Sequence, residues 1–201
     1  MADLGDARVL ILAADGFEES ELFEPRQALL DAGATVTLAS IKTDAIQGVV
    51  HDTEKGRTIT PDLTLEDVDV DDYDALLLPG GVANPDKMRM QDRAVGIVGE
   101  FMDEGKIVAA ICHAPWLLVE ADVVDGRRVT SWPSVRTDLE NAGADVVDEQ
   151  VVVDENLITS RKPDDIPAFN RALIEALEND LGEDEDEDEV ETDAEAGSDD
   201  A

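Results

Sequence analysis

The side chain best suited to covalent chemistry is Cys112, the only cysteine in the chain. It follows the apolar run 106–111 and precedes residues with a helical pattern, so we expect it on a tight strand-to-helix turn. A thiol near a helix N-terminus is favoured as the thiolate, which is the nucleophilic form. Lone cysteines are often buried and inert, and the G-x-S-x-G signature is absent, so position alone leaves both interpretations open.

A nucleophilic thiol commonly works with an imidazole or a carboxyl group. His113 is adjacent to the thiol, whereas His51 lies in a polar segment and is expected at the surface. Glu18 is the carboxyl candidate: near the thiol, burial and an anionic sulfur would raise its pKa, and it could donate a hydrogen bond to the thiolate. The alternative, a charge at the N-terminus of the next helix, is favoured on the residues alone.

A pair of glycines, Gly80 and Gly81, follows Pro79 at the end of another apolar run. Glycines let the backbone approach a ligand closely and could present N–H groups to an oxyanion. The pair is equally consistent with a simple turn, and its spacing is not that of a dinucleotide or phosphate loop.

The elements that must position these residues alternate between strands and helices. Apolar runs at 8–14, 73–78 and 106–111 are typical of strands buried on both faces of a parallel sheet. Residues 41–62 are expected to be irregular, with weak strand character at 58–60. The other expected elements are strands at 34–40 and 128–131, a hairpin at 151–159, and helices ending near 33 and covering 93–103, 113–121, 135–142 and 163–181.

This alternation predicts an α/β sandwich with a mainly parallel sheet and helices on both faces. In such sheets the carboxyl ends of the strands meet at one edge, where sites form. The residues that follow three of these strands could therefore converge on one crevice. They are Phe17-Glu18, Pro79-Gly80-Gly81 and Cys112-His113.

The composition excludes several classes of function. Among 201 residues, 50 are acidic and 15 basic, which gives a net charge of −35 and argues against binding nucleic acid. The longest apolar runs are far too short to span a membrane, and the N-terminus does not resemble a signal peptide, so a soluble, cytoplasmic protein is expected. One cysteine and two histidines make a zinc site improbable.

The acidic residues are spread along the chain, and lysine is scarce. This pattern favours a surface adapted to molar salt, in which ions screen self-repulsion, over docking of a basic partner. Residues 183–201 form a run of like charge with almost no apolar residue, and we expect a disordered tail after a domain covering 1–182.

Several motifs, in order, resemble the PfpI family of intracellular cysteine peptidases, which belongs to a superfamily that includes the Parkinsonism-associated deglycase and class I glutamine amidotransferases. The likeness covers about residues 7–181, and its strongest motifs are Asp15-Gly-Phe-Glu-Glu-Ser-Glu-Leu22, Leu78-Pro-Gly-Gly81 and Ala110-Ile-Cys-His-Ala-Pro115. It continues through 130–133, 141–143, 151–154 and 158–161.

The resemblance implies a flavodoxin-like fold with Cys112 as the nucleophile and Glu18 hydrogen-bonded to its thiol. It also implies that His113 pairs with an acid from a neighbouring subunit, at the position of Asp86, in a dimer or hexamer. The chain departs from the family pattern here, with Asp in place of Glu and a loop one residue longer. Ala114 also replaces a frequent glycine.

We rank two enzymatic functions equally. One is action on small carbonyls such as methylglyoxal, or on glycated amines, without an external cofactor or metal; the other is cleavage of peptides or proteins. A redox sensor or chaperone centred on Cys112 is the alternative. A glutamine amidotransferase is excluded, because that class needs a histidine far downstream of its cysteine and none follows His113.

Overall fold

A central sheet of seven strands has the order β11-β12-β8-β7-β1-β3-β6. The structure, a computed structural model, describes residues 4–195, with side chains to residue 181. All neighbouring strands pair in parallel except β11 with β12. Their bounds are β1 (Arg8–Leu12), β3 (Thr35–Ser40), β6 (Leu63–Thr64), β7 (Ala75–Leu78), β8 (Ile107–Ile111), β11 (Val151–Asp154) and β12 (Leu157–Ser160).

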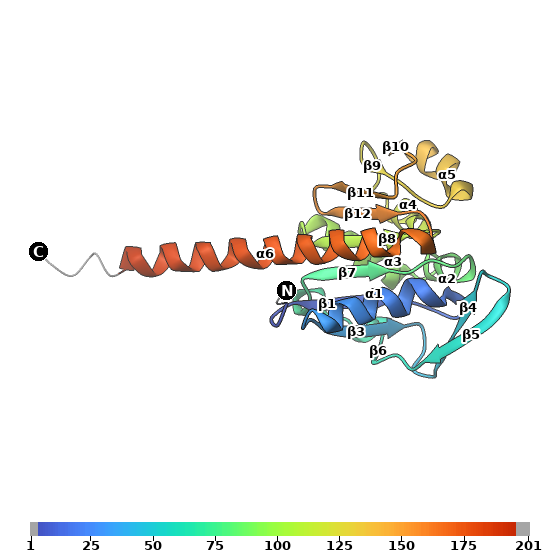
Figure 1. Cartoon of the computed structure of the whole chain (residues 1–201), viewed down its shortest axis with the longest axis horizontal. Helices are drawn as coiled ribbons and strands as arrows, with labels where there is room; N and C mark the ends of the chain where they lie inside the picture. Colours follow the sequence, from blue (N-terminus) through green and yellow to red (C-terminus); the bar gives the residue numbers. More distant parts are fainter. Residues whose placement is uncertain (1–3, 196–201) are drawn as a thin grey trace, which may run out of the picture.

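Helices cover both faces of this sheet (Figure 1). One face packs against α1 (Glu19–Asp31) and α6 (Ile166–Glu195), and the other against α3 (Asp92–Asp103), α4 (Pro115–Glu120) and α5 (Arg136–Asn141). In β1 the side chains alternate, with Val9 and Ile11 in the core under α1 and α6, and Leu10 and Leu12 in the core on the other side. The predicted α/β sandwich is confirmed.

The segment 41–62 differs from the expectation. It contains an antiparallel hairpin of β4 (Ile46–Val50) and β5 (Glu54–Ile59), and β4 also pairs in parallel with β2 (Phe17–Glu18). The expectation of irregular structure was wrong because β5 has no buried residue and therefore lacks the hydrophobic alternation by which a strand is recognised. The remaining elements are α2 (Ala83–Met88), β9 (Arg128–Val129), β10 (Asp145–Val146) and short 3₁₀ turns at Leu65–Asp67, Val70–Asp72, Pro133–Val135 and Pro163–Asp165.

The last helix is longer than predicted. α6 continues through Glu195 and projects beyond the sheet (Figure 1). Residues 196–201 lie outside the described part of the chain, and the expected disordered tail at 183–201 stays a prediction. Residues 183–195 contain no proline or glycine and are rich in glutamate, which has good helix propensity. Within residues 4–195, no helix is both long and apolar enough to cross a membrane.

The sheet topology determines where a site can form. Strand β1 lies between β3 and β7, so successive strands are added on opposite sides of it. The loops that follow β1 and β7 therefore diverge and leave a crevice beyond the carboxyl ends of the strands, the usual place for a ligand in such sheets. Strand β8 is the next neighbour of β7 and ends directly before Cys112.

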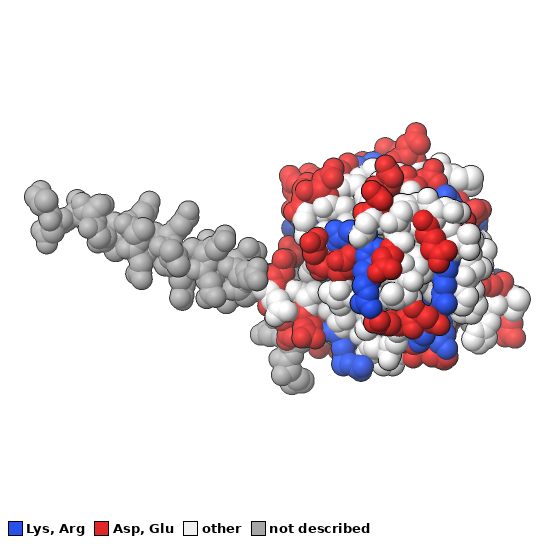
Figure 2. Space-filling view, turned by 90° about the horizontal axis from the view of Figure 1, so that it is seen from above, with Lys and Arg blue, Asp and Glu red and all other residues white. Residues whose placement is uncertain are grey.

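Acidic side chains are distributed over the visible face of the molecule rather than gathered in one patch (Figure 2). Many basic residues are already engaged: Arg136 and Arg161 both pair with Asp148. The excess of carboxylates therefore remains largely uncompensated, and its self-repulsion opposes the compact state.

We expect the thermal unfolding midpoint to rise when KCl is increased from about 0.1 M to molar concentration, because salt shortens the Debye length from about 10 Å to about 3 Å. Circular dichroism at both concentrations measures this shift. Sucrose at equal osmolality is the control, since it stabilises by exclusion without screening charge. Equal midpoints in dilute and concentrated KCl would contradict the predicted salt adaptation.

Candidate active site

The Cys112 backbone is held in the left-handed region, with φ of +66°, directly after β8. Non-glycine residues adopt this conformation rarely and persist in it only where their surroundings enforce it. Here the Cys112 N–H donates to the Ser160 carbonyl at 3.0 Å, and the Cys112 carbonyl accepts from the Trp132 N–H at 2.9 Å. The strand-to-helix elbow expected from the sequence is therefore present, with a side chain that is only 4% exposed.

The carboxyl group that contacts the thiol belongs to Glu21. Its side chain is 0% exposed, hydrogen-bonds the Cys112 thiol, and accepts the Gly80 N–H through Oε2 at 3.0 Å. The expectation that Glu18 hydrogen-bonds the thiol is corrected: Glu18 is buried in the same pocket, but it accepts the backbone N–H groups of His51 and Asp52.

The position at which α1 begins explains why Glu21, rather than Glu18, reaches the thiol. Glu18 is the last residue of β2, whereas Glu21 lies in the first turn of the helix, on the face that it shares with Pro25 and Leu29. That face packs against the core, so Glu21 is carried inward. The spacing of 21, 25 and 29 selects Glu21 from the acidic run only once the start of α1 is known.

Burial raises the pKa of Glu21 to about 8, and the charges of Glu18 and Asp52 contribute in the same direction. Glu21 is therefore mainly protonated at neutral pH. Burial also raises the pKa of the Cys112 thiol, an effect opposed by the N–H groups of Gly81 and His113, which point at the sulfur. The site thus holds its protons tightly and needs a neighbouring group to accept the thiol proton.

His113 is positioned to be that acceptor. Its Nδ1 lies 3.2 Å from the Cys112 sulfur, and burial lowers its pKa, which favours the neutral imidazole. The ring stacks on Trp132 with a centroid distance of 5.5 Å and also contacts Trp116. Adjacent residues need not face each other, so this orientation could not be predicted from the sequence.

The glycine pair lets two loops meet at the thiol. A Cβ at Gly80 would lie 2.7 Å from the Cys112 Cβ and 2.8 Å from the Ile111 carbonyl oxygen, which leaves no room for a side chain. Gly81 has a φ of +79° and directs its N–H at the sulfur. The two glycines therefore do more than form a turn.

Asp86 is exposed on α2 and is not among the residues around the thiol within the described chain. Its expected role across a subunit boundary stays a prediction.

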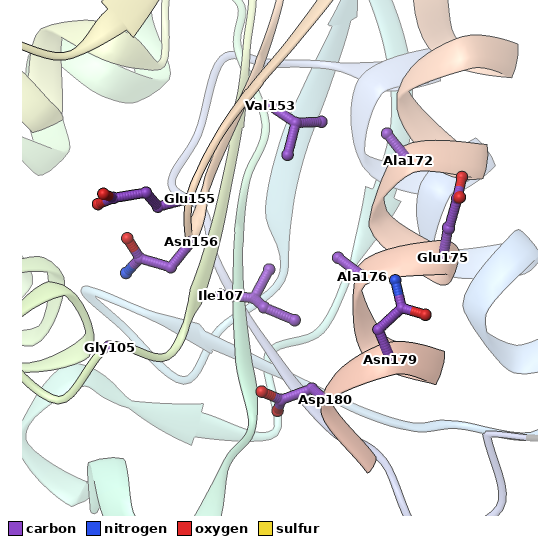
Figure 3. A pocket seen from close by; sticks show the side chains of 10 residues that line it. All are labelled: Gly105, Ile107, Val153, Glu155, Asn156, Ala172, Glu175, Ala176, Asn179 and Asp180. Atoms are coloured by element: carbon purple, nitrogen blue, oxygen red, sulfur yellow. The ribbon is translucent and has the colours of Figure 1, made fainter. Parts of the chain in front are cut away.

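Two cavities in the described part of the chain can be compared as places for chemistry. The larger, about 680 Å³, lies between α6 and the β11–β12 turn, at the opposite end of β8 from Cys112 (Figure 3). Its described lining has no cysteine or histidine. The smaller, about 140 Å³, is lined by Glu18, Glu21, His51, Asp52, Gly81, Cys112, His113, Trp132 and Pro163. Chemistry is therefore assigned to the smaller cavity, which fits a small molecule.

Fold and site together define a flavodoxin-like α/β protein built around a buried cysteine on a strand-to-helix elbow. The chain belongs to the DJ-1/PfpI family, whose sequence profile matches residues 7–176. A protein of Pyrococcus abyssi named a deglycase is 45% identical over 170 residues, covering 85% of this chain and 99% of that protein. General stress protein 18 of Bacillus subtilis is 44% identical over 181 residues, covering 85% of this chain and 98% of that protein.

Solved structures agree with this assignment. Drosophila melanogaster DJ-1beta superimposes with a TM-score of 0.77 at 32% identity, covering 88% of this chain and 91% of that one. A two-domain protein of Anabaena variabilis, with a DJ-1/ThiJ/PfpI-like and a ferritin-like domain, gives a TM-score of 0.80 at 36% identity. The alignment covers 85% of this chain and 48% of that longer protein.

Substituting Gly80→Ala should destabilise the fold by about 1–3 kcal/mol, because the added methyl group overpacks against the Glu21 carboxyl, the Cys112 Cβ and the Ile111 carbonyl oxygen. Gly99→Ala is the matched control: it lies within α3 with no atom within 4 Å of its added Cβ. It should stabilise by about 0.5–1 kcal/mol through helix propensity. Denaturant unfolding measures both, and equal effects would refute the close approach at Gly80.

Glu21→Gln should stabilise the protein increasingly as pH rises. The carboxyl titrates near 4.5 in the unfolded chain and near 8 in the folded one, so the folded state binds more protons between these values. Wild-type stability from this group is therefore lost as pH rises from about 4.5 to about 8, at up to about 1.4 kcal/mol per unit. Gln cannot ionise and avoids that loss. Unfolding midpoints of both proteins at about pH 5 and pH 8 test this, and a constant difference would contradict it.

Proposed function

We propose that the protein is a Cys112-dependent enzyme that acts on small reactive carbonyls or their adducts with amines, as a deglycase or glyoxalase. The observation that carries this proposal is the grouping of thiol, protonated carboxyl and imidazole around a cavity of about 140 Å³. The name deglycase carried by relatives supports the same reaction class. The name general stress protein 18 supports a role under stress.

The first step is attack of the Cys112 sulfur on the aldehyde carbon. A carbon–sulfur bond forms, the carbonyl π bond opens, and the thiol proton passes to Nδ1 of His113, 3.2 Å away. The carbonyl oxygen takes the proton of Glu21, whose raised pKa keeps it available at neutral pH. The product is a neutral hemithioacetal, and Glu21 is left as a carboxylate.

The second step uses that carboxylate as a base. For methylglyoxal, Glu21 removes the hydrogen from the sulfur-bearing carbon, and a proton is returned to the neighbouring carbon, so oxidation of one carbon balances reduction of the other. The resulting thioester is hydrolysed by one water molecule, which releases lactate and regenerates the thiol. No external electron acceptor is required.

The peptidase alternative receives less support from the geometry. Cys112 is 4% exposed in a small cavity, which an extended peptide would have to enter. The small cavity therefore favours a small carbonyl over a polypeptide, while the sensor or chaperone remains the non-enzymatic alternative.

Turnover of methylglyoxal to lactate should be lost in Cys112→Ala and reduced by about 10²-fold or more in Glu21→Gln, which can donate a hydrogen bond but cannot transfer a proton. Glu18→Gln should retain most of the kcat, because Glu18 does not contact the sulfur. Lactate formation and cleavage of an unstructured protein are measured side by side in concentrated KCl.

Cysteine-dependent cleavage of the protein without lactate formation would instead support the peptidase. A folded wild type that is inactive on both substrates would support the sensor or chaperone. Greater loss in Glu18→Gln than in Glu21→Gln would overturn the assignment of the proton donor.

A further inference from the structure

The cavity around Cys112 has an unusual balance of charge. Its lining contains the three carboxyl groups of Glu18, Glu21 and Asp52, and no lysine or arginine among the described residues. Glu21 is protonated at neutral pH, and burial raises the pKa of Glu18. Asp52 is the exposed acid of the three. It is therefore the group best placed to present a negative charge to an approaching substrate.

Asp52 is held at the entrance of the cavity by several contacts. It lies at the tip of the β4–β5 hairpin, where His51 and Asp52 have φ values of +52° and +58°, two successive left-handed residues. The Asp52 Oδ1 accepts the Val82 N–H at 2.8 Å, beside Gly81, and Glu18 accepts the N–H groups of the hairpin tip. A strained turn with these anchors fixes the carboxylate in place.

The charge of Asp52 reaches the groups that surround the thiol. Burial is the largest influence on the pKa values of Glu18, Glu21 and His113, and the negative charge of Asp52 acts on all three in the direction of a raised pKa. On Glu18 the backbone N–H of Asp52 acts in the opposite direction and more strongly. These residues come from β2, α1 and the elbow, so the effect is felt on several sides of the cavity. A charge that acts on all three also acts on a substrate placed between them.

We propose that the site selects substrates by charge, with Asp52 repelling anionic carbonyls such as 2-oxo acids and admitting neutral dicarbonyls or cationic amine adducts. The substrate classes rest on the proposed function. The selection itself concerns access to Cys112 and can be measured without turnover.

Two alkylating reagents of nearly equal size provide the probe. Iodoacetamide is neutral and iodoacetate is an anion; in both, sulfur forms a bond to the methylene carbon as iodide leaves, and the thiol proton is lost to a base. Because Cys112 is the only cysteine, mass spectrometry of the intact chain reports its modification. The ratio of the two rate constants, divided by the ratio for a small free thiol, measures charge selection.

Asp52→Asn is the diagnostic variant. Asparagine retains the oxygen that accepts the Val82 N–H and tolerates a left-handed backbone. Any change in the nucleophilicity of the thiol affects both reagents and cancels in the ratio. Glu54→Gln is the matched control, since it removes one exposed charge from the same hairpin without lining the cavity.

The normalised preference for iodoacetamide should fall about three- to ten-fold in Asp52→Asn, the effect of one charge several Å away in a dielectric near that of water. It should remain unchanged in Glu54→Gln. Thermal unfolding confirms that both variants fold. In the wild type, the preference should fall as KCl rises, because the field of the whole chain is screened, and level off at a residual preference that Asp52→Asn removes.

An unchanged ratio in Asp52→Asn, or equal falls in both variants, would overturn the proposal. A second measurement compares methylglyoxal with glyoxylate. If neither is turned over while the alkylation ratio shifts as expected, the proposed function fails and charge selection stands. If methylglyoxal is turned over while the alkylation ratio does not depend on Asp52, the proposed function stands and charge selection fails.

Discussion

The contact between the buried Glu21 carboxyl and the Cys112 thiol is the constraint on which the rest of the site depends. A carboxylate and a thiolate cannot both be ionised in a small buried space without a large electrostatic cost, so the pair retains a proton at neutral pH. The Gly80 N–H fixes one oxygen of that carboxyl, and a glycine is required there because any Cβ would collide with the same two residues. Proton retention and the glycine turn are therefore parts of one arrangement.

The parallel sheet explains how such an arrangement can be maintained. Cys112, His51 and Asp52 all have a left-handed backbone, which is unfavourable for residues with a side chain. Cys112 is held through hydrogen bonds to Ser160, at the end of β12, and to Trp132, and the hairpin tip is held through Val82 and Glu18. Rigid strand ends thus support strained loops, and these loops present the reactive groups to the crevice.

The sequence predicted the parts of the site that depend on strand ends. Short apolar runs located β1, β7 and β8, so the positions of Gly80, Gly81 and Cys112 followed from the topology of parallel sheets. The choice between Glu18 and Glu21 did not follow, because it depends on where α1 begins, and helix boundaries shift by a residue or two without a strong capping signal. No side chain caps the N-terminus of α1.

The hairpin that carries Asp52 was missed for a different reason. Its second strand pairs only with β4 in the small sheet and exposes both faces, so neither burial nor periodicity marks it in the sequence. Its left-handed tip consists of histidine and aspartate rather than the asparagine–glycine pair that identifies tight hairpin turns. Long-range contacts with the loop after Gly81, rather than local sequence preference, determine this conformation.

The acidic composition and the charge of the cavity act over different distances. With a net charge of −35, the whole chain repels anions at low ionic strength, but molar salt shortens that influence to about 3 Å. In such salt the general field of the surface therefore cannot discriminate among substrates. A carboxylate at the cavity entrance, separated from the substrate by no intervening ion, retains its effect under the same conditions. Discrimination by charge in this protein must then arise from the few residues that approach the substrate directly, and the hairpin tip is the element that supplies one.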